Sequence, residues 1–153
     1  MTDRRALLER FRTGSRAIDA ALAGITDEEL DRAPADGGWT ARQVAHHLAD
    51  SEAMAYTRLR RVIADEDPHI QGYDEPAWAE RLHYDRPIAE AVAVAHAVRA
   101  ASLSLLESLD LEEWERHGDH GESGRYSVDT WLEIYARHPH EHAEQIRAAR
   151  GQG

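Results

Sequence analysis

The stretch that decides the fold lies near the C-terminus and reads Trp131-Leu132-Glu133-Ile134-Tyr135-Ala136-Arg137-His138-Pro139-His140-Glu141-His142-Ala143-Glu144-Gln145-Ile146. Apolar and histidine side chains recur in it at steps of three or four residues, which is the spacing of one helical face. The pattern predicts a long helix that begins after Ser127 and turns His138 and His142 inward. Pro139 should kink this helix or begin a separate one, because proline removes a backbone donor.

Three further long helices are predicted upstream by the same periodicity. The first covers about residues 3–22, the second 41–64, where Thr40 and Gln43 fit a capping box, and the third begins at Pro87. The third has apolar residues over much of its surface, so we expect it to be the most buried. Short helical turns are expected at 27–29 and 77–82.

The segments between these helices set the architecture. Residues 65–86 are polar and interrupted by proline and glycine, which predicts a long excursion that could act as a lid. Residues 111–126 contain three glycines and are expected to form a loop, and no segment has a convincing strand pattern. The prediction is therefore an all-α four-helix bundle, with one domain over residues 1–150 and a disordered tail at 151–153.

Composition narrows the function. The chain has 153 residues, 18 basic and 29 acidic, for a net charge of −11, and no cysteine. A thiolate zinc site and a cysteine nucleophile are excluded, and all basic residues are arginine, which excludes lysine chemistry. The acidic balance argues against nucleic acid as a partner. With no signal peptide at Met1 and no run of about 18 apolar residues, we expect no membrane partner and a cytoplasmic location.

Ten histidines are the unusual feature of the composition. His138 and His142 are four residues apart, so their rings stack on one helical face and can share a metal ion. His47 falls on the inward face of the second helix and is the best placed third ligand. Three histidines would leave coordination positions for water or substrate. The alternative is that these rings only satisfy core hydrogen bonds. His46 is expected to be exposed, and His120 is left undecided.

Four separated stretches can be compared with known motifs: Gly38-Trp39-Thr40-Ala41-Arg42-Gln43-Val44-Ala45-His46-His47-Leu48-Ala49-Asp50-Ser51, Asp74-Glu75-Pro76-Ala77-Trp78-Ala79, His120-Gly121-Glu122-Ser123-Gly124 and Tyr135-Ala136-Arg137-His138-Pro139-His140-Glu141-His142. In this order they resemble motifs of the DinB-like superfamily, in particular its YfiT-type branch of metal-dependent hydrolases and thiol S-transferases. The chain departs from the family pattern at Arg137, Pro139 and Gly121, so pocket shape and substrate could differ.

The resemblance implies a four-helix bundle, usually homodimeric, in which His47, His138 and His142 bind one divalent metal ion, nickel or zinc. It also implies transfer of a low-molecular-weight thiol, such as bacillithiol or mycothiol, to an electrophile, or hydrolysis as the alternative. Candidate catalytic or orienting groups are Asp50, Glu141 and Tyr135. Two other readings stay open: a non-catalytic metal-binding stress-response module, which would favour a fourth protein ligand, and a metal-free helical interaction protein.

Overall fold

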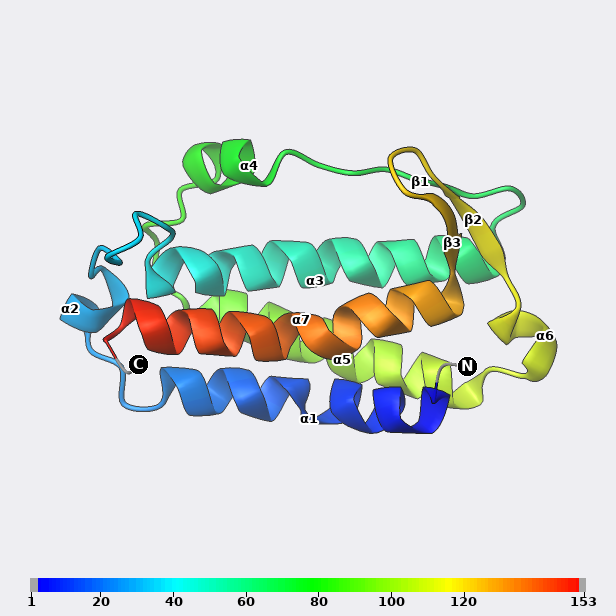
Figure 1. The fold of residues 1–153 in the computed structure, drawn as a ribbon, viewed down its shortest axis with the longest axis horizontal. Coiled ribbons are helices and arrows are strands. Elements are labelled where there is room, and N and C mark those ends of the chain that lie inside the picture. Colours follow the sequence, from blue (N-terminus) through cyan, green and yellow to red (C-terminus); the bar gives the residue numbers. More distant parts are fainter. Residues whose placement is uncertain (1–2, 152–153) are drawn as a thin grey trace.

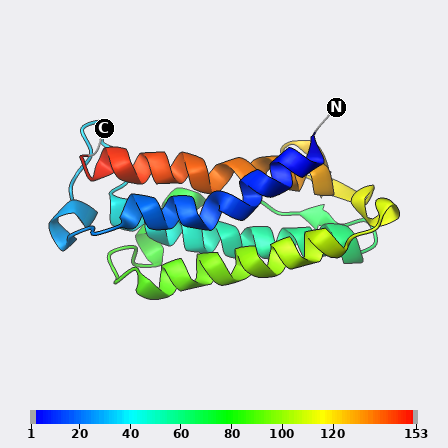
Figure 2. The same ribbon diagram turned by 90° about the horizontal axis from the view of Figure 1, so that it is seen from below.

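Four long helices form the body of the molecule in the computed structural model, which describes residues 3–151 (Figure 1). They are α1 (Arg4–Leu22), α3 (Ala41–Ala64), α5 (Ala89–Ser108) and α7 (Val128–Ala149). Helices α1 and α7 run in one direction and α3 and α5 in the other, as the two views of the ribbon show (Figures 1 and 2). The predicted tail lies partly outside the described residues, because positions 152 and 153 are not included.

The helices begin where the sequence supplies side-chain caps. Thr40 accepts a hydrogen bond from the Gln43 amide, and the Gln43 side chain accepts one from the Thr40 amide, which completes the expected capping box. Asp3 and Ser127 cap α1 and α7 in the simpler way, by accepting from the amide three residues on. These caps explain why the predicted starts of the first, second and fourth helices agree with the structure.

A small sheet replaces part of the expected loop structure. Its strands are β1 (His69–Ile70), β2 (His117–His120) and β3 (Gly124–Ser127), with β2 parallel to β1 and antiparallel to β3. Gly118 permits this pairing, because a Cβ atom there would lie 2.3 Å from the Pro68 carbonyl oxygen. The prediction of a loop over residues 111–126 was wrong at these strands and at the short helix α6 (Leu111–Trp114). The strands were missed because segments this short show no clear alternation of apolar and polar residues in the sequence.

The excursion between α3 and α5 has a topological role. It contains β1 and the short helix α4 (Glu75–Arg81), and it runs back along α3 so that α5 begins at the same end of the bundle as α3 (Figure 1). This return makes α3 and α5 parallel neighbours, which a short turn could not do. At that same end lies the short helix α2 (Asp27–Leu30), close to the expected helical turn.

Helix α7 passes through Pro139 without ending, so the proline does not begin a separate helix. A proline at 139 cannot donate to the carbonyl of Tyr135, four residues earlier. The Arg99 guanidinium replaces the missing donor: its Nη1 lies 3.1 Å from the Tyr135 carbonyl oxygen. Gly14 makes room for both groups, because a Cβ there would lie 2.5 Å from Pro139 Cγ and 2.7 Å from Arg99 Nη2.

The core consists of two apolar clusters separated along the bundle by polar side chains. One cluster includes Phe11, Leu59 and Trp131, and the other includes Ile18, Leu48 and Ile146. The polar side chains between them, which we call the polar layer, are His47, Glu52, Arg99, His138 and His142. Burying charged groups is costly unless they are paired, so the polar layer is the first place in the bundle to look for a functional site.

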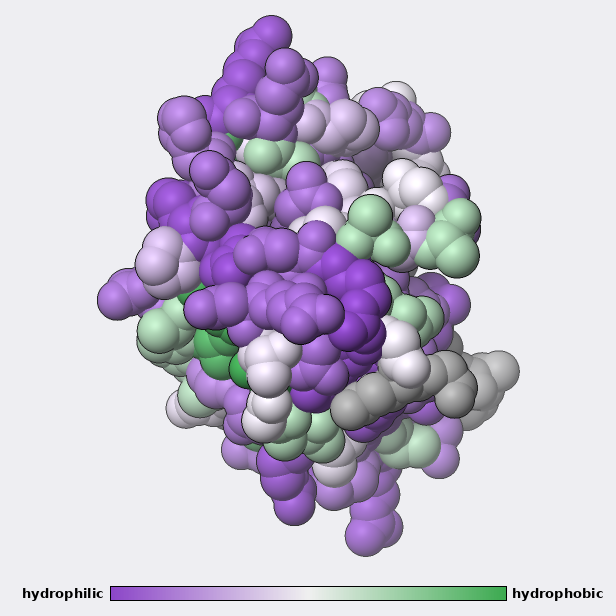
Figure 3. All heavy atoms as spheres, turned by 90° about the vertical axis from the view of Figure 1, so that its left-hand side faces the viewer, coloured by the Kyte–Doolittle hydropathy of each residue, from purple (hydrophilic) through white to green (hydrophobic). Residues whose placement is uncertain are grey.

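Helix α5 is not the most buried helix, contrary to expectation. Only five of its residues are buried, against twelve in α3, because its apolar residues lie all around the helix and the bundle covers one face. By length and composition alone α5 would also pass as a membrane span, although Arg99 from this helix lies inside the bundle. The end of the bundle next to α2 presents mainly hydrophilic residues (Figure 3).

Candidate metal centre

Three histidines converge in the polar layer. His47 comes from α3, and His138 and His142 come from successive turns of α7. One ring nitrogen of each lies within 4.8 Å of the other two, and His138 Nε2 lies 3.1 Å from His142 Nε2. Nitrogens bound to one ion at 2.0–2.1 Å are separated by about 3 Å, so this spacing fits a shared divalent metal.

The outer nitrogens of two rings are held by acceptors. His138 Nδ1 lies 3.2 Å from Glu52 Oε1, and His142 Nδ1 lies 2.8 Å from Gln145 Oε1. An acceptor at Nδ1 fixes the tautomer that leaves the Nε2 lone pair free, which is how metal-binding histidines are usually oriented. His47 Nδ1 is buried and has no hydrogen-bond partner. This arrangement of ring nitrogens fits the binding of a cation better than it fits histidines whose hydrogen bonds are all satisfied within the core.

Burial keeps two of these imidazoles neutral. Burial first, and then the neighbouring His142 and His138, together lower the pKa of His47 from 6.5 to about 3. Burial and then His138 lower the pKa of His142 to about 4, against a smaller opposing effect of Gln145. Neutral imidazole is the form that binds metal, so both rings are in the competent state at neutral pH.

Glu52 and Arg99 form the inner support of the cluster. Both side chains are 2% exposed, and Arg99 Nη1 lies 2.9 Å from Glu52 Oε1, the oxygen that also faces His138. Arg99 Nη2 donates to the Phe11 carbonyl at 2.8 Å. The Glu52 carboxylate is therefore held by the Arg99 guanidinium, which also donates to backbone carbonyls of α1 and α7. The same carboxylate orients His138.

Aromatic and polar side chains surround the cluster. Trp39 packs on His47 with ring centroids 4.9 Å apart, and Tyr84 lies at the edge of Trp39. The Tyr84 hydroxyl donates to Asp50 Oδ2 at 2.6 Å, which orients a carboxylate one turn after His47. On the α7 side, the Tyr135 ring lies 5.7 Å from the His138 ring. Aromatic rings and one held carboxylate therefore surround the three histidines.

Three other residues named in the sequence analysis, Tyr135, Glu141 and His46, have different surroundings. Tyr135 is buried, and its hydroxyl accepts a hydrogen bond from Arg58 Nη1 at 3.1 Å. Glu141 is exposed and acts on His142 only through its charge. His46 was expected to be exposed, which was wrong: it is 1% exposed, because its ring stacks on Tyr84 and its Nε2 lies 2.8 Å from the Arg86 carbonyl oxygen.

His120 does not join the cluster. It ends β2, where its ring stacks on Tyr126 with centroids 5.8 Å apart. The metal-binding group found within residues 3–151 has three histidines as its members. A closed site with four protein ligands would need one more group from the chain.

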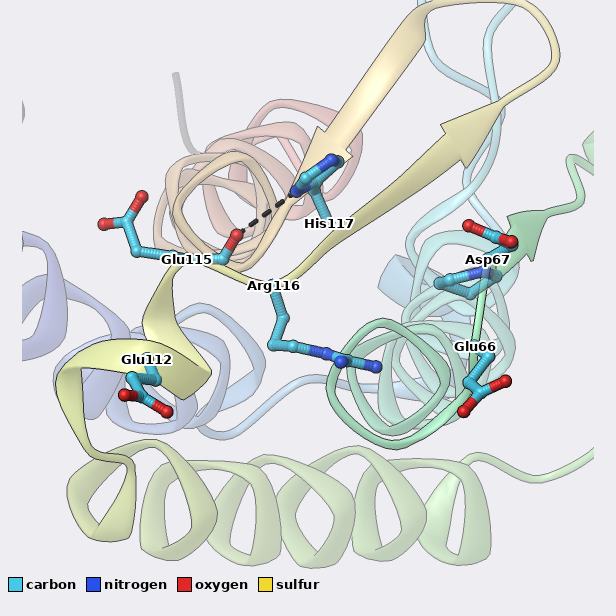
Figure 4. Close-up of a pocket in the computed structure, with 7 residues that line it drawn as sticks. Glu66, Asp67, Glu112, Glu115, Arg116 and His117 are labelled. Atoms are coloured by element: carbon cyan, nitrogen blue, oxygen red, sulfur yellow. Dashed lines mark hydrogen bonds between the residues drawn. The ribbon is translucent and has the colours of Figure 1, made fainter.

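A separate hollow of about 440 Å³ lies at the other end of α3 (Figure 4). It is bounded by Glu66 and Asp67 on one side and by the α6–β2 turn on the other, where His117 Nδ1 contacts the Glu115 carbonyl oxygen at 3.2 Å. Four carboxylates line it and nothing in it points to a ligand. The candidate metal centre therefore lies in the polar layer and not in this hollow.

Fold and site together define the class: a bundle of four long helices around a partly buried three-histidine cluster. A model of the DinB superfamily matches residues 10–146, and the chain belongs to this superfamily. The structure of YfiT from Bacillus subtilis, described as a probable metal-dependent hydrolase with an unusual four-helix bundle topology, is similar with a TM-score of 0.88 and 26% identity, covering 100% of this chain and 91% of YfiT.

Two relatives support the same assignment. A protein of Oceanobacillus iheyensis is 40% identical over 131 residues, which cover 86% of this chain and 76% of the relative. A protein of Bacillus cereus is 31% identical over 133 residues, covering 87% and 77%. Both have names that class them as metal-dependent hydrolases. The predicted family and the four-helix bundle are thus confirmed.

Proposed function

We propose that His47, His138 and His142 bind one divalent metal ion, nickel or zinc, and that the chain is a metal-dependent enzyme that activates a small nucleophile there. The observation that supports this most directly is three imidazoles within 4.8 Å, two of them with their outer nitrogens held by Glu52 and Gln145. The names of the relatives, which class them as metal-dependent hydrolases, agree with it. When bound, the ion would lower the pKa of a water or thiol in an open position.

The nucleophile that we propose is an external low-molecular-weight thiol. The chain has no cysteine, so the sulfur must come from a co-substrate. Its sulfur forms a bond to the electrophilic carbon while the leaving group departs with its electron pair. Asp50, held by the Tyr84 hydroxyl one turn after His47, takes the thiol proton and releases it to solvent.

The activity can be tested with a panel of small thiols and 1-chloro-2,4-dinitrobenzene as the chromogenic electrophile. Metal-loaded protein should consume thiol faster than chelated protein, and Asp50→Asn should slow the reaction at least about a hundredfold. Glu66→Gln is the matched control, because Glu66 lies in the hollow at the far end of α3. Equal rates with and without metal for every thiol would exclude the transferase.

Hydrolysis is the second candidate, and the names of the relatives favour it. The same site would then direct water at an ester or amide. Release of a chromophore from model esters or amides without any thiol would favour this candidate. If neither reaction occurs while the metal is retained, the non-catalytic metal-binding role becomes the better account. The homodimer and the cytoplasmic location stay predictions.

A further inference from the structure

A second polar cluster lies beside the metal centre and takes no part in holding the three histidines. It consists of the Arg58 guanidinium and the hydroxyls of Tyr73, Tyr126 and Tyr135, and we call it the arginine–phenol cluster. Arg58 comes from α3, Tyr135 from α7, Tyr126 from β3 and Tyr73 from the excursion. Four segments that are distant in the sequence thus bring hydrogen-bond donors to one place.

Several of these donors have no partner. Arg58 Nη1 donates to the Tyr135 hydroxyl at 3.1 Å and Nη2 donates to the Gln71 carbonyl at 2.8 Å, but Arg58 Nε is buried without a hydrogen bond. The Tyr73 hydroxyl is also buried and unpaired. A buried donor without an acceptor is unfavourable, so the cluster lacks an acceptor that a ligand could supply.

Tyr126 adds a further hydroxyl to the cluster. The residue is 2% exposed, and its hydroxyl lies against Arg58 and Tyr135 with no hydrogen bond of normal geometry to satisfy it. Burial raises the pKa of this phenol, so it remains a neutral donor. A guanidinium that only donates, surrounded by neutral hydroxyls, is suited to an anionic oxygen acceptor.

The charge of Arg58 is not balanced by an ion pair. Within residues 3–151 its polar contacts are tyrosine hydroxyls and a backbone carbonyl, whereas Arg99 is paired with Glu52 and Arg150 with Glu29. Asp50 lies near Tyr73, where its Oδ2 accepts from Tyr84, and in the described part of the chain it forms no ion pair with Arg58. The cluster therefore holds a positive charge that a ligand anion can neutralise.

The position of the cluster relates it to the metal centre. Arg58 follows His47 by eleven residues, or about 16 Å along α3, and side chains on a helix lean toward its N-terminus, here toward His47. Tyr135 spans the remaining distance, since its hydroxyl contacts Arg58 and its ring lies 5.7 Å from that of His138. Gln71 and Gly72 next to the cluster are exposed, so it lies beneath surface backbone.

We propose that the arginine–phenol cluster binds a carboxylate of the substrate, and that the substrate class is elongated small molecules with a carboxylate at one end and the reacting group at the other. The carboxylate would accept from Arg58 Nε and from the Tyr73 and Tyr126 hydroxyls. The link to a reacting group rests on the proposed metal function, whereas the anion site itself does not.

The test compares ω-mercaptocarboxylates with ω-mercaptoalcohols of the same chain length, for example 6-mercaptohexanoate with 6-mercaptohexanol, binding to metal-loaded protein by calorimetry. At the best length the carboxylate should bind roughly tenfold more tightly, the value expected for one charge-assisted contact. Arg58→Gln should remove this preference and leave the affinity of the alcohol unchanged. Equal affinities in the unmodified protein, or a preference that survives Arg58→Gln, would overturn the proposal.

Arg60→Gln is the matched control, because Arg60 is on the same helix but stacks on Tyr56 and donates to Ser102. Tyr73→Phe removes one hydroxyl and should reduce the preference about threefold without unfolding risk.

Hexanoate titrated into metal-free protein separates the two hypotheses: saturable binding that requires Arg58 supports the anion site even if the metal assignment fails. No Arg58-dependent binding of hexanoate or of the mercaptocarboxylates would reject the anion site.

Discussion

Two arginines donate to different atoms of Tyr135, and the difference between their surroundings separates structural support from ligand recognition. Arg99 donates to the Tyr135 carbonyl, is 2% exposed and is paired with Glu52. Arg58 donates to the Tyr135 hydroxyl, is partly exposed and has an unpaired Nε. A fully satisfied charge in the interior organises the fold, whereas an unsatisfied one near the surface is available to a ligand.

The largest effect is expected on the Arg99 side. Arg99→Leu leaves Glu52 as an unpaired buried charge and leaves the Tyr135 carbonyl without a donor, so the free energy of unfolding should fall by about 3–5 kcal/mol. Chemical denaturation measures this loss. A change below about 1 kcal/mol would show that Arg99 is not a structural residue.

The double variant Glu52→Leu/Arg99→Met distinguishes stability from metal binding. Removing both charges should restore part of the lost stability, because no buried charge is left alone. Metal affinity should still be about 10–100-fold lower than in the unmodified protein, since His138 has lost the acceptor at Nδ1. Full recovery of metal affinity would mean that Glu52 does not orient His138.

The polar layer also predicts a pH dependence for the metal-free protein. The pKa values of His47 and His142 in the folded state are lowered from 6.5 to about 3 and about 4. Below pH 6.5 these two residues are therefore protonated in the unfolded chain while they are still neutral in the folded state. The contribution of these two groups to stability is fully present above pH 6.5 and is lost as the pH falls toward about 3. The melting temperature followed against pH measures this, and the double variant His47→Gln/His142→Gln should show a weaker dependence. A curve that is unchanged in that variant would contradict the assignment.

Gly14→Ala tests the packing that joins Arg99 to Pro139. The added Cβ would lie 2.5 Å from Pro139 Cγ and 2.7 Å from Arg99 Nη2, so one of them must move, at a cost of about 1–3 kcal/mol. Thermal unfolding measures the loss. Gly24 is no control because its φ is +65°. Ala20→Gly in α1 is one, because Ala20 is exposed and the change should cost about 1 kcal/mol from helix propensity alone.

The smallest effect on stability is expected at Arg58. Arg58→Gln removes two hydrogen bonds at a partly exposed site and also removes an incompletely satisfied charge, so stability should change by less than about 1 kcal/mol. Thermal unfolding compares it directly with Arg99→Leu. If Arg58→Gln proves as destabilising as Arg99→Leu, the distinction between the two arginines fails.

Most of the bundle could be predicted from the sequence, because local signals specify it. The caps at Thr40 and Ser127 and the three-and-four spacing after Trp131 place two helices and bring the candidate histidines to inward faces. The small sheet could not be predicted in this way, since its pairing joins β1 to β2 across 46 residues of chain.

The supporting residues of the site were missed for a related reason. Nothing near Glu52 or Arg99 marks them as a pair, because a single charged residue on a helix is ordinary until its partner is known. Pro139 was the one available signal: a proline inside a helix leaves a carbonyl free, and a buried donor must replace the missing one. Which arginine supplies it depends on how α5 packs, and sequence periodicity does not specify that.

The most direct test of the central claim is a crystal structure of protein loaded with nickel or zinc, with an anomalous difference map at the metal edge. The account predicts one peak at 2.0–2.1 Å from a nitrogen of each of His47, His138 and His142, with at least one coordination position not taken by the protein. A peak elsewhere, no peak in the presence of excess metal, or a fourth protein ligand that closes the site would contradict it.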